Sequence, residues 1–345
     1  MHKVFFVCLM LLLPAVVSAA PVGSATKAKG TVLYKARGGV YQPLGARQVV
    51  NEGDWVKTGK DGWLELTLSD NSRFTIANGS ELEIQSYLVS KTSKTGSFGL
   101  TRGKLRASVM KLAGQQTDIK VRSSTAVAGV KGTEFLMLSQ GPANVFFGNE
   151  GTVAVSGTSG ESEPLPADTM TQNTRGYRPT VAVRVDQGTP LARAKQDFEA
   201  ATGLLPPEEW GEVDNLANII ARWNINHGHY LADSGRHDEA LQVFQIALDL
   251  TTLSDVRADA RLERGSVYAR FLDHPEAALA EYLLVLEEYP KIPQMETALF
   301  NAGQTLNEMG KTDLAKARFR QYLAEYPEGR YKSSVETLLK MLERQ

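Results

Sequence analysis

The chain has 345 residues, with 38 lysines and arginines, 39 aspartates and glutamates, and a single cysteine, which excludes a disulfide within the chain. At roughly 100 to 200 residues per domain, this length predicts two domains, each large enough to bury a core. The net charge of −1 hides a difference between the halves, because residues 21–185 carry +7 and residues 186–345 carry −9. The basic half meets an anionic polymer, docks on its acidic neighbour, or is merely solvated, and we favour the last two interpretations over the first.

The first twenty residues have the order of a secretory signal. Lys3 precedes an apolar run over residues 4–17, and small residues follow at 18–20. We therefore expect a signal peptide at residues 1–20, cleaved after Ala20, and a periplasmic mature chain. The run is short for the roughly 20 residues that cross a bilayer, so a permanent anchor is the less favoured alternative. Because no second run of this length occurs, we expect no membrane segment in the mature chain.

Residues 30–155 alternate apolar and polar residues over short spans, interrupted by glycine, asparagine and aspartate. Leu64, Leu66 and Leu68 fall on one face of such a span, as in a strand with one buried side. Turn residues follow at 69–72 and 78–79, so the connections are too short for crossover helices. The pattern predicts an all-β N-terminal half.

Three separated blocks carry a resemblance to a known family. They read EGDWVKTGKDGWLELTLSDNSRF from residue 52, LTRGKLRASV from residue 100, and AVAGVKGTEF with NEGTVAV between residues 126 and 155. In this order they resemble the FecR family of periplasmic regulators. The resemblance implies a small β domain over residues 21–157, built as a roll or a solenoid-like stack. The best-known members regulate a sigma factor through transmembrane and cytoplasmic segments, which we do not expect ahead of this domain.

Basic side chains recur in these blocks. They are Arg102, Lys104, Arg106, Arg122 and Lys131. They form either a basic surface for a protein partner, peptidoglycan or another anionic glycan, or solvated positions on strand faces. We favour solvated faces, since alternation with apolar neighbours already places every second residue outward. We interpret Gly129 and Gly132 as structural.

Residues 158–206 are expected to connect the two halves. They are rich in Gly, Ser, Thr, Glu and Pro, with a short β-like patch at 180–185. Thr189 and Pro190 are a typical cap and first position of a helix, which we expect to end near Gly203. Pro206 and Pro207 end this connector, so a helical domain is expected over residues 207–345.

From residue 208 the apolar period becomes helical, and an internal repeat is visible. Each of three units places small residues where two helices touch and an aromatic ring between them. The residues that keep this spacing are Gly228, Gly235, Ala240, Phe244 and Ala247, then Gly265, Ala278, Tyr282 and Pro290, and finally Gly303, Gly310, Ala315, Phe319 and Pro327. Over residues 218–330 the spacing resembles that of the tetratricopeptide family, which implies an all-α array of helical hairpins.

In that family the first helix of each hairpin lines a concave groove in which a partner segment lies. Applying the repeat frame to this sequence gives a set of groove residues. They are Arg222, Ile225, His229 and Asp233, then Asp259, Leu262, Ser266 and Arg270, and finally Thr297, Phe300, Gln304, Asn307 and Glu308. The alternative for each residue is contact with a neighbouring helix or with solvent.

The sequence has no P-loop, no dinucleotide-binding glycine turn and no Gly-x-Ser-x-Gly elbow. His227 and His229 lie two apart on a predicted helix and therefore point in different directions, so we expect no metal site there. Glu287 and Glu288 lie on a helix surface, where solvated charge is expected. We therefore expect no enzyme activity, no cofactor and no metal.

These observations predict a β plus α protein of two domains, and we infer a periplasmic adaptor. The β domain would bind or sense one envelope component, and the helical groove would hold a protein partner. One alternative is a signalling component that acts through a separate membrane partner. Another is a cell-wall enzyme whose site no motif reveals. We expect no nucleic-acid partner.

Overall fold

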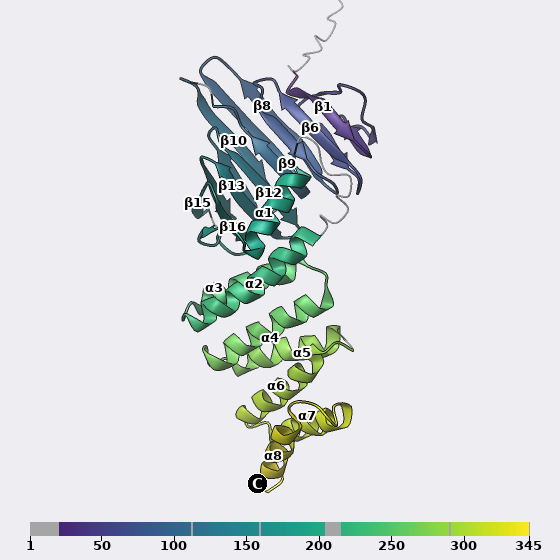
Figure 1. The fold of residues 1–345 in the computed structure, drawn as a ribbon, viewed down its shortest axis with the longest axis vertical. Coiled ribbons are helices and arrows are strands. Elements are labelled where there is room, and N and C mark those ends of the chain that lie inside the picture. The colour runs from purple at the N-terminus through teal and green to yellow at the C-terminus, as the bar shows by residue number, and fades with distance from the viewer. Residues whose placement is uncertain (1–20, 112, 159, 204–214, 290, 345) are drawn as a thin grey trace, which may run out of the picture.

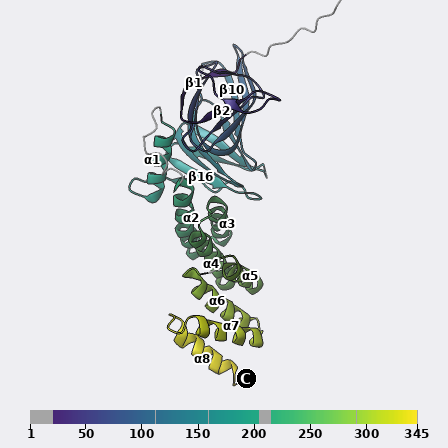
Figure 2. The same ribbon diagram turned by 90° about the vertical axis from the view of Figure 1, so that its right-hand side faces the viewer.

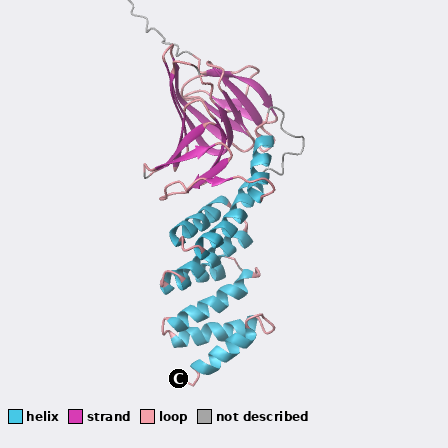
Figure 3. Ribbon diagram, turned by 60° about the vertical axis from the view of Figure 1, so that its left-hand side comes forward, coloured by secondary structure: helices cyan, strands magenta, loops and turns pink. Residues whose placement is uncertain are grey.

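The computed structural model describes residues 21–111, 113–158, 160–203, 215–289 and 291–344. A β domain is followed by a column of helices that extends away from it (Figure 1). Figure 3 shows the same division, with strands gathered at one end and helices at the other. The predicted class, an all-β N-terminal part and an all-α C-terminal part, is confirmed. The predicted signal peptide 1–20, Pro206, Pro207 and Pro290 lie outside the described residues.

The β domain consists of two sheets that share one long strand, β9 (Ser93–Ser108). The first sheet has the order β4 (Val49–Val50), β1 (Gly23–Lys29), β6 (Trp63–Leu68), β7 (Arg73–Ile76), β9, β12 (Glu134–Gln140), β13 (Ala143–Glu150), β16 (Thr169–Asn173) and β17 (Val183–Arg184). The second has the order β3 (Gln42–Pro43), β2 (Val32–Lys35), β5 (Trp55–Thr58), β8 (Glu81–Val89), β9, β10 (Gln116–Arg122), β11 (Ala126–Val130), β14 (Thr152–Gly157) and β15 (Ser162–Pro166). Among these pairs only β9 and β10 run parallel.

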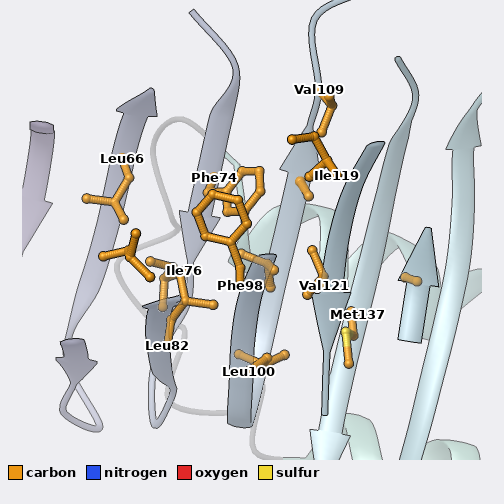
Figure 4. Packing of buried hydrophobic residues seen from close by; sticks show 14 of the residues in the cluster. Leu66, Phe74, Ile76, Leu82, Phe98, Leu100, Val109, Ile119, Val121 and Met137 are labelled. Carbon is orange, nitrogen blue, oxygen red and sulfur yellow. The ribbon is translucent and has the colours of Figure 1, made fainter. Parts of the chain in front are cut away.

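The core of the β domain lies between the two sheets, which curve around a common interior (Figure 2). Leu66 and Phe74 of the first sheet and Phe98 and Leu100 of β9 belong to this core, and all four are fully buried (Figure 4). The rings of Phe74 and Phe98 have centroids 4.5 Å apart. Every second residue of these strands therefore points into the shared interior, and the residues between them in the first sheet point to its outer face.

One ion pair is sealed inside the β domain. Lys94 Nζ lies 2.6 Å from Asp70 Oδ2, and neither side chain has exposed surface. Burial opposes the ionisation of Asp70, but hydrogen bonds from Lys94 and Ser72 outweigh it, so the pKa of Asp70 lies below its ordinary value. The pair fastens the turn after β6 to the start of β9.

Both sheets continue past residue 157, where the sequence places the end of the β domain. Strand β15 pairs with β14, β16 pairs with β13, and β17 pairs with β16, so residues 162–166, 169–173 and 183–184 belong to the sheets. Helix α1 (Pro190–Ala201) follows, and the Thr189 side chain caps it by accepting a hydrogen bond from the Ala192 amide. The expected connector is therefore largely strand and helix that pack on the β domain.

The outer face of the first sheet is apolar over β12 and β13, and three helices cover it. These helices are α1, α2 (Leu216–Asp233) and α3 (His237–Leu250). A single buried cluster joins them to the sheet: Leu136, Leu138, Val145, Phe147, Met170, Leu191, Ala194, Phe198, Leu216, Ala217, Ile220, Ile246, Ala247 and Leu250. The buried amides of Gln172 on β16 and Asn224 on α2 also exchange two hydrogen bonds, of 2.5 and 3.0 Å. The β domain and the first helical hairpin thus share one core.

The remaining helices are α4 (Ser254–Arg270), α5 (Pro275–Glu288), α6 (Gln294–Glu308), α7 (Thr312–Glu325) and α8 (Lys332–Leu342). The structure brings each predicted glycine against its aromatic partner, in the pairs Gly228–Phe244, Gly265–Tyr282 and Gly303–Phe319. Ala240, Ala247, Ala278 and Ala315 are fully buried, Gly235 and Gly310 end their helices with φ of 78° and 71°, and Pro327 is exposed after α7. Helices α2–α3, α4–α5 and α6–α7 therefore form three hairpins in which a ring packs on a glycine.

Asp70→Asn removes the buried negative charge and leaves Lys94 uncompensated. We expect the free energy of unfolding at pH 7, measured by urea denaturation, to fall by about 3–5 kcal/mol. Because the folded-state pKa of Asp70 is lowered, its contribution is present above the unfolded-state value of about 3.9 and is lost as the pH falls below it. The variant should therefore lose less stability than the wild type between about pH 5 and pH 3.

Asp118→Asn is the matched control, because Asp118 forms an exposed pair with Lys120 at 3.0 Å. Its expected effect is below about 1 kcal/mol. Replacing both buried partners, as Asp70→Asn with Lys94→Met, should restore part of the loss. Equal effects of Asp70→Asn and Asp118→Asn would contradict the role given to the buried pair.

Gly303→Ala tests the packing of a ring on a glycine, because the new Cβ would lie 2.5 Å from Phe319 Cε1. Overpacking costs about 1–3 kcal/mol, and a gain in helix propensity of about 1 kcal/mol offsets part of it. We expect a net loss of stability in thermal denaturation, relieved by adding Phe319→Leu. Gly129→Ala is the control, since its new Cβ would make only ordinary contacts, at 3.6 Å or more. A stabilised Gly303→Ala variant would show that the contact is not tight.

Candidate functional site

The first helices of the three hairpins lie next to one another, because α2 contacts α4 and α4 contacts α6. Side chains from the predicted groove set connect α2 to α4. Arg222 Nη2 lies 2.8 Å from Asp255 Oδ2, and His229 Nδ1 lies 3.2 Å from Glu263 Oε2. His229 Nε2 also lies 3.5 Å from Asp233 on its own helix. All three predicted polar residues of α2 therefore belong to one polar surface.

The same surface continues from α4 to α6 and beyond. The Gln294 side chain on α6 donates a hydrogen bond of 2.9 Å to Asp259 on α4. Thr297 Oγ1 accepts one of 2.5 Å from Arg330, which precedes α8. Among the other predicted residues, Ser266, Gln304 and Asn307 are half-buried, whereas Arg270 and Glu308 are exposed.

Three apolar residues of the predicted groove set pack into the protein instead. The Phe300 ring stacks on Tyr331 with centroids 4.2 Å apart, and 9% of Phe300 is exposed. Ile225 packs against the cluster shared with the β domain, and Leu262 packs against the cores between α4, α5 and α6. For Phe300 the prediction of a groove position is corrected. Tyr331, which follows the last hairpin and is not part of the repeat frame, covers its ring.

Four residues complete the polar surface and were not in the predicted set: Asp255, Glu263, Gln294 and Arg330. Two of them have a signal in the sequence, since Asp255, Asp259 and Glu263 are spaced by four and so share one face of a helix. Gln294 and Arg330 have no such signal, because they reach the surface from a helix start and from a loop.

This surface lies where the tetratricopeptide frame predicts the groove, so we call it the polar groove, and its charges are mostly negative. Its acidic residues are Asp233, Asp255, Asp259, Glu263 and Glu308, and its arginines are Arg222, Arg270 and Arg330. The pKa of Asp259 is raised, first by burial and also by the neighbouring Asp255, against the hydrogen bond from Gln294. The pKa of Asp255 is lowered, chiefly by its hydrogen bond from Arg222. A cationic group bound near Asp259 would therefore favour its charged form.

The basic residues of the β domain do not gather on one face. Lys104 and Arg106 lie in the part of β9 that pairs with β12, whereas Arg102 and Arg122 belong to the second sheet. Arg106 is held by Glu134 at 2.6 Å, and Arg102 lies 3.8 Å from Glu81. Lys131 follows β11 and lines a cavity together with residues of β9 and β10. The described residues thus offer no single basic surface built from this set.

In the part of the chain that the structure describes, no three His, Cys, Asp or Glu side chains are grouped so that they could hold a metal ion. His227 stacks on Trp223 with centroids 4.6 Å apart, and burial, followed by the nearby Arg236, lowers its pKa. None of the described helices combines the length and the apolar character needed to cross a bilayer.

Comparison with family models divides the chain in the same way. Residues 54–154 match the FecR protein family, and residues 225–293 and 297–329 match two tetratricopeptide repeat families. Both kinds of domain are regulatory or scaffold domains without catalytic activity of their own. No curated protein sequence matches the chain.

Solved structures match each part separately. A Parabacteroides distasonis protein described as an anti-sigma factor is 14% identical, with a TM-score of 0.34, over 41% of this chain and 64% of its own. The second tetratricopeptide domain of human RPAP3, solved with an HSP70 peptide, is 16% identical, with a TM-score of 0.31, over 37% of this chain and 99% of its own. The family matches carry the assignment: the chain joins an N-terminal FecR domain to a C-terminal array of tetratricopeptide repeats.

Proposed function

We propose that this protein is a non-enzymatic scaffold of the bacterial periplasm, in which the polar groove holds a segment of an envelope protein. The secretory pattern of residues 1–20 and the FecR domain support this location. The observation that carries the proposal is the continuous polar surface to which we give the name polar groove. It runs across α2, α4 and α6, and side chains join each helix to the next.

The charge of the polar groove defines the partner that fits it. Asp233, Asp255, Asp259, Glu263 and Glu308 outnumber the arginines, so an extended or helical segment with lysine or arginine side chains is complementary. Such pairing at exposed positions speeds association and selects the partner more than it adds affinity. The proposed partner is therefore a basic segment of a protein.

The role proposed for the β domain follows from its attachment. Because the sheet and the first hairpin share a buried cluster, a partner in the polar groove is held at a fixed position relative to the β domain. A second envelope component on the β domain, with peptidoglycan as one candidate, would then meet the first partner in a defined geometry. Regulation through a separate membrane protein uses the same arrangement and is the second candidate function, supported by the FecR domain.

In-cell crosslinking of the full chain, followed by mass spectrometry, tests the polar groove. Asp233→Lys reverses an exposed charge on α2 without touching the buried clusters. We expect a specific partner to be captured by the wild type and to be reduced roughly fivefold or more in this variant, because attraction becomes repulsion. Capture should also weaken at high salt, where a Debye length of about 3 Å at 1 M screens exposed charges.

Glu287→Lys makes the same change of charge on α5, the second helix of its hairpin, and serves as the control. It should leave capture unchanged. A partner that both variants retain would place the binding surface elsewhere, and equal loss in both would indicate a general effect of net charge. Separate halves of the chain are unsuitable for this test, because cutting between them exposes the shared cluster.

A further inference from the structure

A polar pocket of about 330 Å³ lies on the outer face of the first sheet, away from the polar groove. Its floor comes from four adjacent strands, β6, β7, β9 and β12. The pairing registers place Glu65, Thr75 and Arg106 in one row across the sheet, and Arg73, Ser108 and Glu134 in the next row. Thr202, at the end of α1, forms one wall. The site therefore rests on rigid elements.

Glu65 lines this pocket, and one of its two carboxylate oxygens lacks a hydrogen-bond donor in the part of the chain that the structure describes. The residue is 4% exposed, and its Oε1 accepts a hydrogen bond of 2.8 Å from Thr26 and lies 3.5 Å from Lys27 Nζ. Its Oε2 is buried and has no hydrogen-bond partner among the described residues. A buried acceptor without a partner costs about 1–3 kcal/mol, so a bound donor would remove a penalty that the fold carries.

The two arginines of the pocket have different roles. Arg106 donates from Nε and Nη2 to Glu134 Oε1, and Asn149 donates to the same oxygen. The charges of Arg106 and Glu134 therefore compensate each other within the protein. Arg73 is exposed at the start of β7 and has no ion-pair partner among the described residues. Its guanidinium therefore remains available for an anionic group.

Among the described residues that line the pocket, the two charged ones outside the Arg106–Glu134 pair are Glu65 and Arg73, and they lie in neighbouring rows of the sheet. Trp63 and Ala77 pack against Ala201 at the end of α1, so the row with Glu65 lies next to this helix end and the row with Arg73 lies one step farther away. A helix C-terminus carries about half a negative charge, which adds to that of Glu65. Outside the Arg106–Glu134 pair, the negative group Glu65 thus lies nearer α1 and the positive group Arg73 lies farther from it.

We propose that this pocket binds a small zwitterion of the α-amino acid class. The ammonium group donates to Glu65 Oε2 near the end of α1, and the carboxylate accepts from the Arg73 guanidinium. With Glu65, Glu134, Arg73 and Arg106 the pocket is neutral overall, which suits a ligand without net charge. Its volume is at the lower end of the roughly 300–1,000 Å³ of ligand pockets, as expected for a small molecule.

The test is calorimetric titration of the purified full chain with a panel of free L-amino acids. The best binder is then compared with its N-acetyl form, which lacks the ammonium group, and its amide, which lacks the carboxylate. We expect one bound molecule per chain and loss of binding with both analogues. Titration with alanyl-alanine distinguishes a free amino acid from a short peptide as the ligand. If the dipeptide binds more tightly than alanine and depends on the same residues, the ligand is a short peptide.

Two substitutions locate the site. Glu65→Gln should weaken binding of the free amino acid about tenfold or more, and so should Arg73→Gln, because each removes a charge-assisted hydrogen bond. Arg184→Gln, at an arginine on β17 that is 83% exposed, should leave binding unchanged. Circular dichroism checks folding, and Arg73→Gln carries the test alone if Glu65→Gln does not fold. No binding of any zwitterion at millimolar concentration, or binding that survives both substitutions, would overturn the proposal.

Discussion

The outer face of the first sheet is the surface on which the two halves of the protein meet. Along β12 and β13, Phe135 and Phe146 point into the β core, while Leu136 and Phe147 point out. A strand that is apolar on both sides must be covered on both sides, because exposed rings and branched side chains are costly in water. Helices α1, α2 and α3 provide the cover, and the first hairpin is thereby fixed to the sheet. The direction of the whole helical column depends on this contact.

The rigid junction bears on the proposed scaffold function. Two binding modules on a flexible linker raise each other's effective concentration over a range of orientations. Here Leu216 and Ile220 of the first repeat are part of the same cluster as Leu138 and Val145 of the sheet. Under the proposed function, a partner in the polar groove would be presented at a set distance and angle from the β domain. This arrangement suits an assembly whose components must meet in one geometry.

The same sheet face separates into an apolar region and a polar region. Over β13 and most of β12, the outward residues are apolar and the helices cover them. Over β6, β7, β9 and the start of β12, residues such as Glu65, Arg106 and Glu134 are polar and form a pocket. The end of α1 is the boundary between them, because Ala201 packs on Trp63 and Thr202 lines the pocket. A ligand in the pocket would thus contact the first helix that leads from the sheet to the repeats.

The sequence by itself determined the elements and their local packing. Alternation at Leu64, Leu66 and Leu68 indicated a strand, and the spacing of Gly303 and Phe319 indicated a helical hairpin, because both patterns depend only on residues close in the chain. Only the tertiary structure decided what covers each face. The repeat frame placed Phe300 in the groove, but Tyr331 covers it. Glu65 and Arg73 form one pocket because strand pairing brings them together, and a linear pattern does not encode which strands pair.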